Sequence, residues 1–147
     1  MTERTVRAAL ALLVTQGIIV GAWAAISPRS FYDDFPGGGR AWVAADGPYN
    51  EHLVRDFGDL NLALAAVSLV ALVTMGRALV LAAGLGWIVY QAPHLVYHLR
   101  HLDVYDIADQ VLNVLSLMLA LALPVAVVAL APRLGQDTAA APHQPVR

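Results

Sequence analysis

The sequence contains no cysteine and no lysine, and only 14% of its 147 residues are charged. Soluble proteins contain about 25% charged residues. Without cysteine the chain has no disulfides, thiolate metal ligands or cysteine nucleophiles, so any chemistry uses imidazole, carboxylate, amide or hydroxyl groups. Its nine basic residues are all arginine and do not indicate a nucleic-acid-binding surface. Because so few charges cannot cover a water-soluble globule, the composition predicts an integral membrane protein.

Four apolar stretches are long enough to cross a membrane, which takes about 20 residues for a hydrocarbon core of about 30 Å. The predicted spans are residues 6–26, 53–74, 78–99 and 106–131. The predicted fold is therefore all-α, a transmembrane four-helix bundle with one long outer loop between the first and second helices. Pro93 predicts a kink in the third span. Residues 132–147, rich in Ala, Pro and Gln, predict a disordered tail.

The first span carries two glycines, Gly17 and Gly21, at the spacing that lets two helix backbones approach closely. A cleaved signal peptide is the alternative interpretation, because Arg4 and Arg7 precede the apolar run. The run is too long for a typical signal peptide, which favours a retained span. The glycine face predicts packing against a membrane partner or a second copy of the chain.

Arginine positions suggest an orientation. Arg4 and Arg7 lie immediately before the first span, which places both termini in the cytoplasm by the positive-inside rule. The composition fits a bacterial plasma-membrane protein. In this orientation nine of the eleven acidic residues and four of the five histidines lie at or beyond the outer membrane surface.

Polar side chains recur at helical spacing at the outer ends of the second, third and fourth spans, where residues three or four apart share a face. The three stripes are His52, Asp56 and Asp59; His94, His98 and His101; and Asp106, Asp109 and Asn113. Because an ionisable group facing lipid costs at least a few kcal/mol, we expect the stripes to face inward and converge. They predict a polar pocket in the outer half of the bundle.

Imidazole and carboxylate groups are ligands for Zn²⁺ and non-haem iron, and His-x3-His places two imidazoles on one helix face. Such a metal site could activate water or support a redox step at iron. In that reaction Asp59 and Asp109 are the candidate proton acceptors. The candidate metal ligands are His52, Asp56, His94 and His98. The residues expected to orient these ligands are Asp59, His101, Asp106, Asp109, Asn113 and Arg55. A small polar ligand in place of a metal fits the same residues.

Three other interpretations use the same side chains. In the first, the acids and histidines pair with each other and with Arg55 or Arg100, fix the helix register and bind nothing, as in a non-catalytic membrane subunit. The second is a haem held by His52 together with His94 or His98. The third is a proton path, which is disfavoured because the inner halves of the spans lack ionisable residues.

The outer loop, residues 27–51, contains aromatic residues of the kind found at the membrane interface. Residues 40–45 predict a short interfacial helix, and Pro36 to Gly39 predict a flexible turn. A passive interface loop is the favoured interpretation, and a lid over the polar cluster is the alternative.

With four short spans, glycines in the first helix and Phe31-Tyr32-x2-Phe35-Pro36-Gly37 in a long first outer loop, the chain resembles the small DoxX-like group of bacterial membrane proteins. The resemblance covers residues 6–131 in outline and implies a four-span fold. Some members of that group are associated with quinone or sulfur redox systems. No catalytic residue is carried over, and the histidine-rich end of the third span has no counterpart in the group's general pattern.

Overall fold

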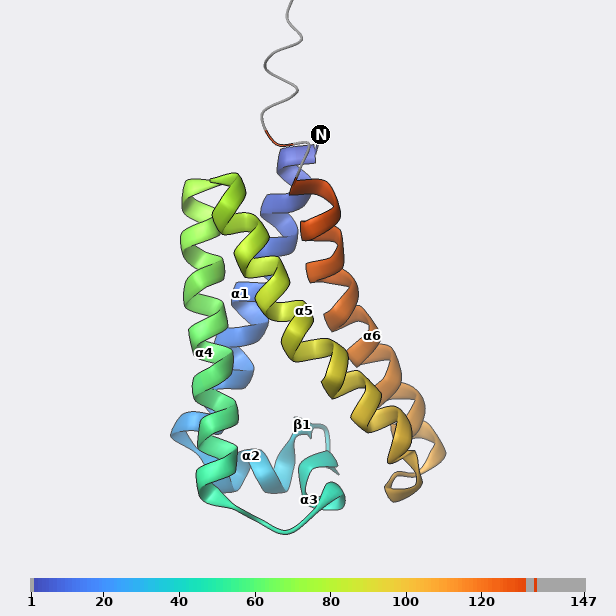
Figure 1. Cartoon of the computed structure of the whole chain (residues 1–147). Helices are drawn as coiled ribbons and strands as arrows, with labels where there is room; N and C mark the ends of the chain where they lie inside the picture. Colours follow the sequence, from blue (N-terminus) through green and yellow to red (C-terminus); the bar gives the residue numbers. More distant parts are fainter. Residues whose placement is uncertain (1, 132–133, 135–147) are drawn as a thin grey trace, which may run out of the picture.

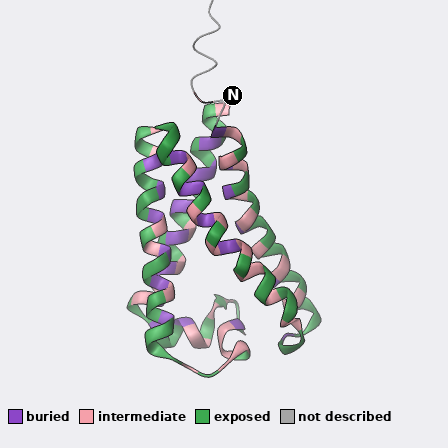
Figure 2. Ribbon diagram, in the orientation of Figure 1, coloured by how far each residue is buried: buried purple, intermediate pink, exposed green. Residues whose placement is uncertain are grey.

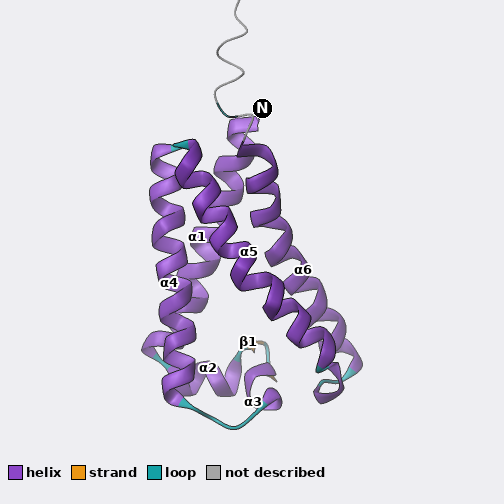
Figure 3. Ribbon diagram, viewed as in Figure 1, coloured by secondary structure: helices purple, strands orange, loops and turns teal. Residues whose placement is uncertain are grey.

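The computed structural model describes residues 2–131 and 134. It contains six α-helices, a two-stranded hairpin and one 3-10 turn (Figures 1 and 3). In chain order these are α1 (Thr2–Ile26), α2 (Pro28–Asp34), β1 (Pro36–Gly37), β2 (Arg40–Ala41), α3 (Trp42–Asp46), α4 (Glu51–Thr74), α5 (Arg77–Arg100), η1 (Leu102–Val104) and α6 (Ile107–Leu130). The predicted tail lies outside the described residues, apart from Leu134.

Four of these helices, α1, α4, α5 and α6, are long and apolar enough to cross a membrane. Their ends lie within four residues of the predicted spans. The all-α four-helix prediction is confirmed, and the chain is a multi-pass membrane protein. Helix α5 continues through Pro93 to Arg100.

The segment between α1 and α4 is more ordered than predicted. Residues 36 to 41 form an antiparallel hairpin, and all three glycines at its turn have positive φ, which only glycine adopts without strain. The predicted interfacial helix is present as α3, although it begins at Trp42. We refer to α2, the hairpin and α3 together as the outer loop, and to this end of the bundle as the loop end (Figure 1).

Helices α1 and α4 pack with almost no space between their backbones. A Cβ atom added to Gly21 would lie 2.8 Å from the Gly58 carbonyl oxygen, and one added to Gly58 would lie 2.5 Å from the Ala25 nitrogen. A Cβ atom on Gly17 would meet Ala65 Cβ at 2.9 Å. Within the chain, α4 therefore occupies the Gly17 and Gly21 face that the sequence predicted to meet a membrane partner or a second copy.

The apolar core lies at the end of the bundle opposite the loop end. Val6 and Leu10 of α1 are fully buried there against Trp87 of α5 and Val127 of α6. The Trp87 indole donates a 2.9 Å hydrogen bond to Ser68 Oγ and ties α5 to α4. Toward the loop end α5 and α6 lean away from α4 (Figure 1), and fewer residues of these two helices are buried (Figure 2). A pocket lies in this part of the bundle, and residues of the four long helices and of the outer loop line it.

Candidate functional site

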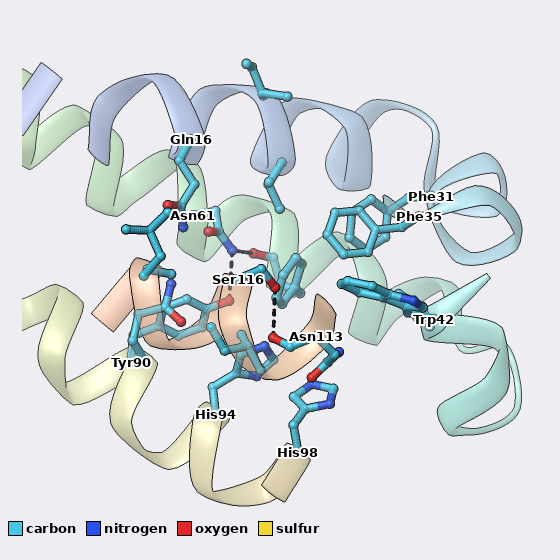
Figure 4. Close-up of a pocket in the computed structure, with 18 of the residues that line it drawn as sticks. Gln16, Phe31, Phe35, Trp42, Asn61, Tyr90, His94, His98, Asn113 and Ser116 are labelled. Carbon is cyan, nitrogen blue, oxygen red and sulfur yellow. Dashed lines mark hydrogen bonds between the residues drawn. The ribbon is translucent and has the colours of Figure 1, made fainter. Parts of the chain in front are cut away.

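A pocket of about 790 Å³ occupies the loop end of the bundle. Each of the four long helices contributes to its wall, and so does the outer loop (Figure 4). Most lining side chains are apolar or aromatic. The polar ones are Thr15, Gln16, Asp46, Asn61, Tyr90, Gln91, His94, Tyr97, His98, Tyr105, Asn113 and Ser116. The pocket is therefore chiefly apolar, whereas the sequence predicted a polar one.

The outer loop supplies an aromatic floor to the pocket. The rings of Phe31 and Phe35 lie 4.7 Å apart, and Trp42 packs edge-on to Phe35 at 6.2 Å. The Tyr105 hydroxyl donates a 3.2 Å hydrogen bond to the Trp42 carbonyl, and burial raises the pKa of Tyr105 to about 12, so this donor keeps its proton at physiological pH. The loop therefore forms part of the wall of a chiefly apolar pocket, whereas the sequence favoured a passive interface loop or a lid over a polar cluster.

Two polar contacts fasten the outer loop to α5 and α6. Arg40 Nε of the hairpin donates to Asp109 Oδ1 of α6 at 2.5 Å. The Tyr97 hydroxyl of α5 donates to Asp46 Oδ1 of α3 at 3.3 Å. These contacts join the loop to the two helices that lean away from α4, and they hold the floor of the pocket in place.

Exchange of Asp109 for asparagine is expected to loosen this floor. The substitution keeps the side-chain volume and removes the charge that pairs with Arg40, a loss of about 1 kcal/mol for a partly exposed pair. The backbone amides of α3 should then exchange with deuterium about fivefold faster. Asp103→Asn, at an exposed position of η1, is the control. Unchanged exchange in Asp109→Asn would mean that the aromatic contacts and the hydrogen bonds from Tyr97 and Tyr105 hold the loop without the Arg40 ion pair.

Aromatic rings on one face of α5 continue the wall from the floor into the bundle. His94 stacks on Tyr90 with ring centroids 5.7 Å apart, and its ring lies 4.7 Å from that of His98. His98 in turn lies 6.3 Å from Tyr105, nearly parallel to it. The third histidine of the stripe is turned differently, since His101 stacks on Tyr97 and contacts the Tyr97 carbonyl through Nδ1 at 2.7 Å.

Four buried polar atoms at the pocket have no hydrogen-bond partner among the described residues. They are Trp42 Nε1, Gln91 Oε1, His98 Nδ1 and Asn113 Oδ1. Gln91 and Asn113 are each only 3% exposed. The amide of Asn61 differs, because it donates to the Phe57 carbonyl at 2.8 Å and to the Tyr90 hydroxyl at 3.2 Å. Of the three buried side-chain amides in the wall, Asn61 has hydrogen-bond partners, whereas the oxygens of Gln91 and Asn113 have none among the described residues.

The four predicted metal ligands do not meet. His94 and His98 line the pocket, whereas His52 is not part of its wall. His52 and Asp56 pair with each other at 3.3 Å on the exposed face of α4, where the His52 side chain is 87% exposed. Within residues 2–131 and 134, no three His, Asp or Glu side chains are grouped so that they could hold a metal ion. The structure also does not bring His52 together with His94 or His98, the pairs that were considered as haem ligands.

The residues expected to orient the metal ligands are also dispersed. Asp59 is exposed on α4, so the prediction that it faces the interior is wrong. Arg55 pairs with Glu51 at 2.9 Å and also donates to the Ala25 carbonyl. Asp106 caps the first turn of α6 by accepting from the Asp109 amide at 2.9 Å. Helix α4 lines the pocket with Val54, Phe57 and Asn61, and the predicted stripe lies on another, exposed face of the same helix.

Asn113 is the one member of the predicted polar set on α6 that is buried at the pocket. Gln91, Trp42, Asp46 and Tyr105 were missed. The sequence contains a signal for Gln91, because an amide within an otherwise apolar span indicates a buried polar position, as it does for Asn113. The other three lie in the outer loop or the turn before α6, and sequence periodicity gives no information about where such segments fold.

No protein-family model, curated protein or solved structure matches the chain.

Proposed function

We propose that the protein binds a small lipid-soluble molecule in the pocket at the loop end. The observation that carries this proposal is the pair of buried, unpaired amide oxygens, Gln91 Oε1 and Asn113 Oδ1, at the wall of a chiefly apolar pocket. A buried polar atom without a partner costs about 1–3 kcal/mol. A bound molecule that donates hydrogen bonds to these atoms recovers that cost.

The shape of the pocket supports the same function. Its volume of about 790 Å³ lies within the range of roughly 300–1,000 Å³ typical of small-molecule sites. Such sites are apolar, with a few placed polar groups, and the wall described above has this character. The outer loop closes one end of the pocket with Phe31, Phe35 and Trp42, which shields a bound molecule from water.

A metal-dependent activity has less support. His94 and His98 lie on one helix and offer two imidazoles, and the wall adds one carboxylate, Asp46. The groups do not form a three-ligand cluster in the described residues. We therefore assign no catalytic residue and propose binding as the function.

The proposal includes the location and the orientation of the protein in the membrane. Arg4 and Arg7, in the first two turns of α1, favour cytoplasmic termini, and the pocket then lies in the outer half of a bacterial plasma membrane. The outline of four spans and one long first loop favours membership of the DoxX-like group. Both statements rest on the sequence.

Filling the pocket tests the binding function. Ala120 lines the pocket on α6 and is buried, so Ala120→Phe places a ring in it. Native mass spectrometry of protein extracted into lipid nanodiscs is expected to show one bound small molecule in the wild type. The same adduct should be largely lost in Ala120→Phe.

The matched control is Met118→Phe, two residues away on α6, where the side chain is exposed and outside the pocket wall. This variant should retain the adduct. Absence of any adduct from the wild type, or equal occupancy in Ala120→Phe, would refute the proposed function.

A further inference from the structure

The charge of the wall restricts the head group of the ligand. Among the described residues, the lining side chains include no arginine, and the chain has no lysine. Asp46 is the one carboxylate in the described part of the wall. An anionic head group would lose its hydration, meet no permanent cation and face this carboxylate, which is unfavourable in a low-dielectric site. The wall therefore selects against phosphate, sulfate and carboxylate heads.

Three of the four unpaired polar atoms lie toward the loop end of the pocket, and the fourth, Gln91 Oε1, is nine residues before the end of α5. Trp42 and His98, which carry two of the unpaired nitrogen atoms, lie at this end, and Asn113 is six residues into α6, about 9 Å from the helix start (Figure 4). The Trp42 indole is a donor, whereas the Asn113 oxygen is an acceptor. A neutral head with both hydroxyl donors and oxygen acceptors matches this pair.

Deeper in the bundle, exposed and mostly apolar side chains of α1 and α6 form part of the pocket wall. Leu12, Ile19 and Leu119 line the pocket and are nevertheless 55%, 61% and 64% exposed. Leu119 is twelve residues into α6, which corresponds to about 18 Å of helix and lies at the depth of lipid chains. The two helices meet beyond this level, where Val6 and Val127 belong to the same buried core. We infer that the pocket reaches the bilayer at this exposed part of the wall, and we call the part marked by Leu12, Ile19 and Leu119 the side opening.

From these three features we infer that the pocket binds a single-chain, uncharged amphiphile. Its neutral head lies at the loop end beside Trp42 and Asn113, and its apolar chain leaves the pocket through the side opening into the bilayer. This inference rests on the proposed function and specifies the chemical class of the ligand. It also gives the route of entry, because a molecule already dissolved in the membrane reaches the pocket without crossing water.

Three photoreactive probes that differ only in the head group test this inference. Each has the same sixteen-carbon chain with a diazirine, and the heads are a glycerol ester, a sulfate and a trimethylammonium group. The full chain is reconstituted in phosphatidylcholine nanodiscs and irradiated with each probe. Labelled peptides are mapped by mass spectrometry, with and without excess monopalmitoylglycerol, which separates saturable labelling from background labelling of lipid-facing residues.

The glycerol probe is expected to label α1 and α6 saturably at the side opening. The sulfate probe should label these positions at least about tenfold less, because its charge has no partner in the wall. Ala120→Phe should remove the saturable labelling, and Met118→Phe should retain it.

Other outcomes overturn the inference in distinguishable ways. Equal labelling by the sulfate probe would show that the head need not be neutral, although binding in the pocket would stand. Preferential labelling by the trimethylammonium probe would show that Asp46 selects a cation. If no probe labels saturably, the ligand is not a single-chain amphiphile, and the bound adduct in the nanodisc extract decides separately whether the pocket holds another molecule.

Discussion

Exchange of Gly58 for alanine is expected to destabilise the protein by about 3 kcal/mol, because the added methyl group cannot be accommodated between α1 and α4. Its Cβ atom would lie 2.5 Å from the Ala25 nitrogen and 2.8 Å from the Gly21 carbonyl oxygen. Both are backbone atoms, so relief requires a shift of a whole helix. Alanine favours helix over glycine by about 1 kcal/mol, so the steric cost must exceed this gain.

Thermal unfolding in nanodiscs measures this effect, with Gly76→Ala as the control. A Cβ atom on Gly76 has only Thr74 Oγ1 near it, at 3.8 Å. The control should therefore unfold close to the wild-type temperature. A Gly58→Ala protein as stable as the control would show that α1 and α4 are not in the described contact. The Gly17 and Gly21 face would then again be available to another chain, as the sequence predicted.

This glycine contact illustrates what sequence could and could not determine. The spacing of Gly17 and Gly21 correctly indicated that a helix backbone approaches α1 closely. It did not indicate which helix, because the partner residue Gly58 lies in a segment dominated by charged neighbours, Arg55, Asp56 and Asp59. Those charges led to the expectation of an inward polar stripe. In the structure Gly58 is among the residues that α4 buries, and Asp59 is exposed beside it.

The span boundaries were predictable because they depend on local hydropathy and on caps such as Asn50 and Asp106. The site was predictable only in part. Histidine spacing correctly placed His94 and His98 on one face, and this face lines the pocket. Whether the α4 stripe shares that space depends on which face of α4 packs against α1, and that face is set by Gly58 and its contact with Gly21 and Ala25. The position of Trp42 under the pocket depends on how the hairpin folds back.

Exchange of the two unpaired amides for apolar side chains of similar shape is expected to raise stability while removing ligand binding. In Gln91→Met and Asn113→Leu the buried oxygens that lack partners are lost, and each change should stabilise the ligand-free protein by about 1 kcal/mol or more. If Gln91 and Asn113 only held the helices together, both substitutions would lower the stability of the protein. Unfolding in nanodiscs gives the stability, and occupancy by the bound molecule gives the binding.

Asn61→Leu is the control with the opposite expected sign. The Asn61 amide is 1% exposed and bonded to the Phe57 carbonyl and the Tyr90 hydroxyl, so its loss should destabilise the protein by about 1–3 kcal/mol. Destabilisation of all three variants to the same extent would mean that Gln91 and Asn113 have structural partners, and the pocket would lose the polar groups on which its proposed ligand depends. Natural proteins retain buried groups that lower their own stability where a bound partner recovers the cost, and the two amides fit this description.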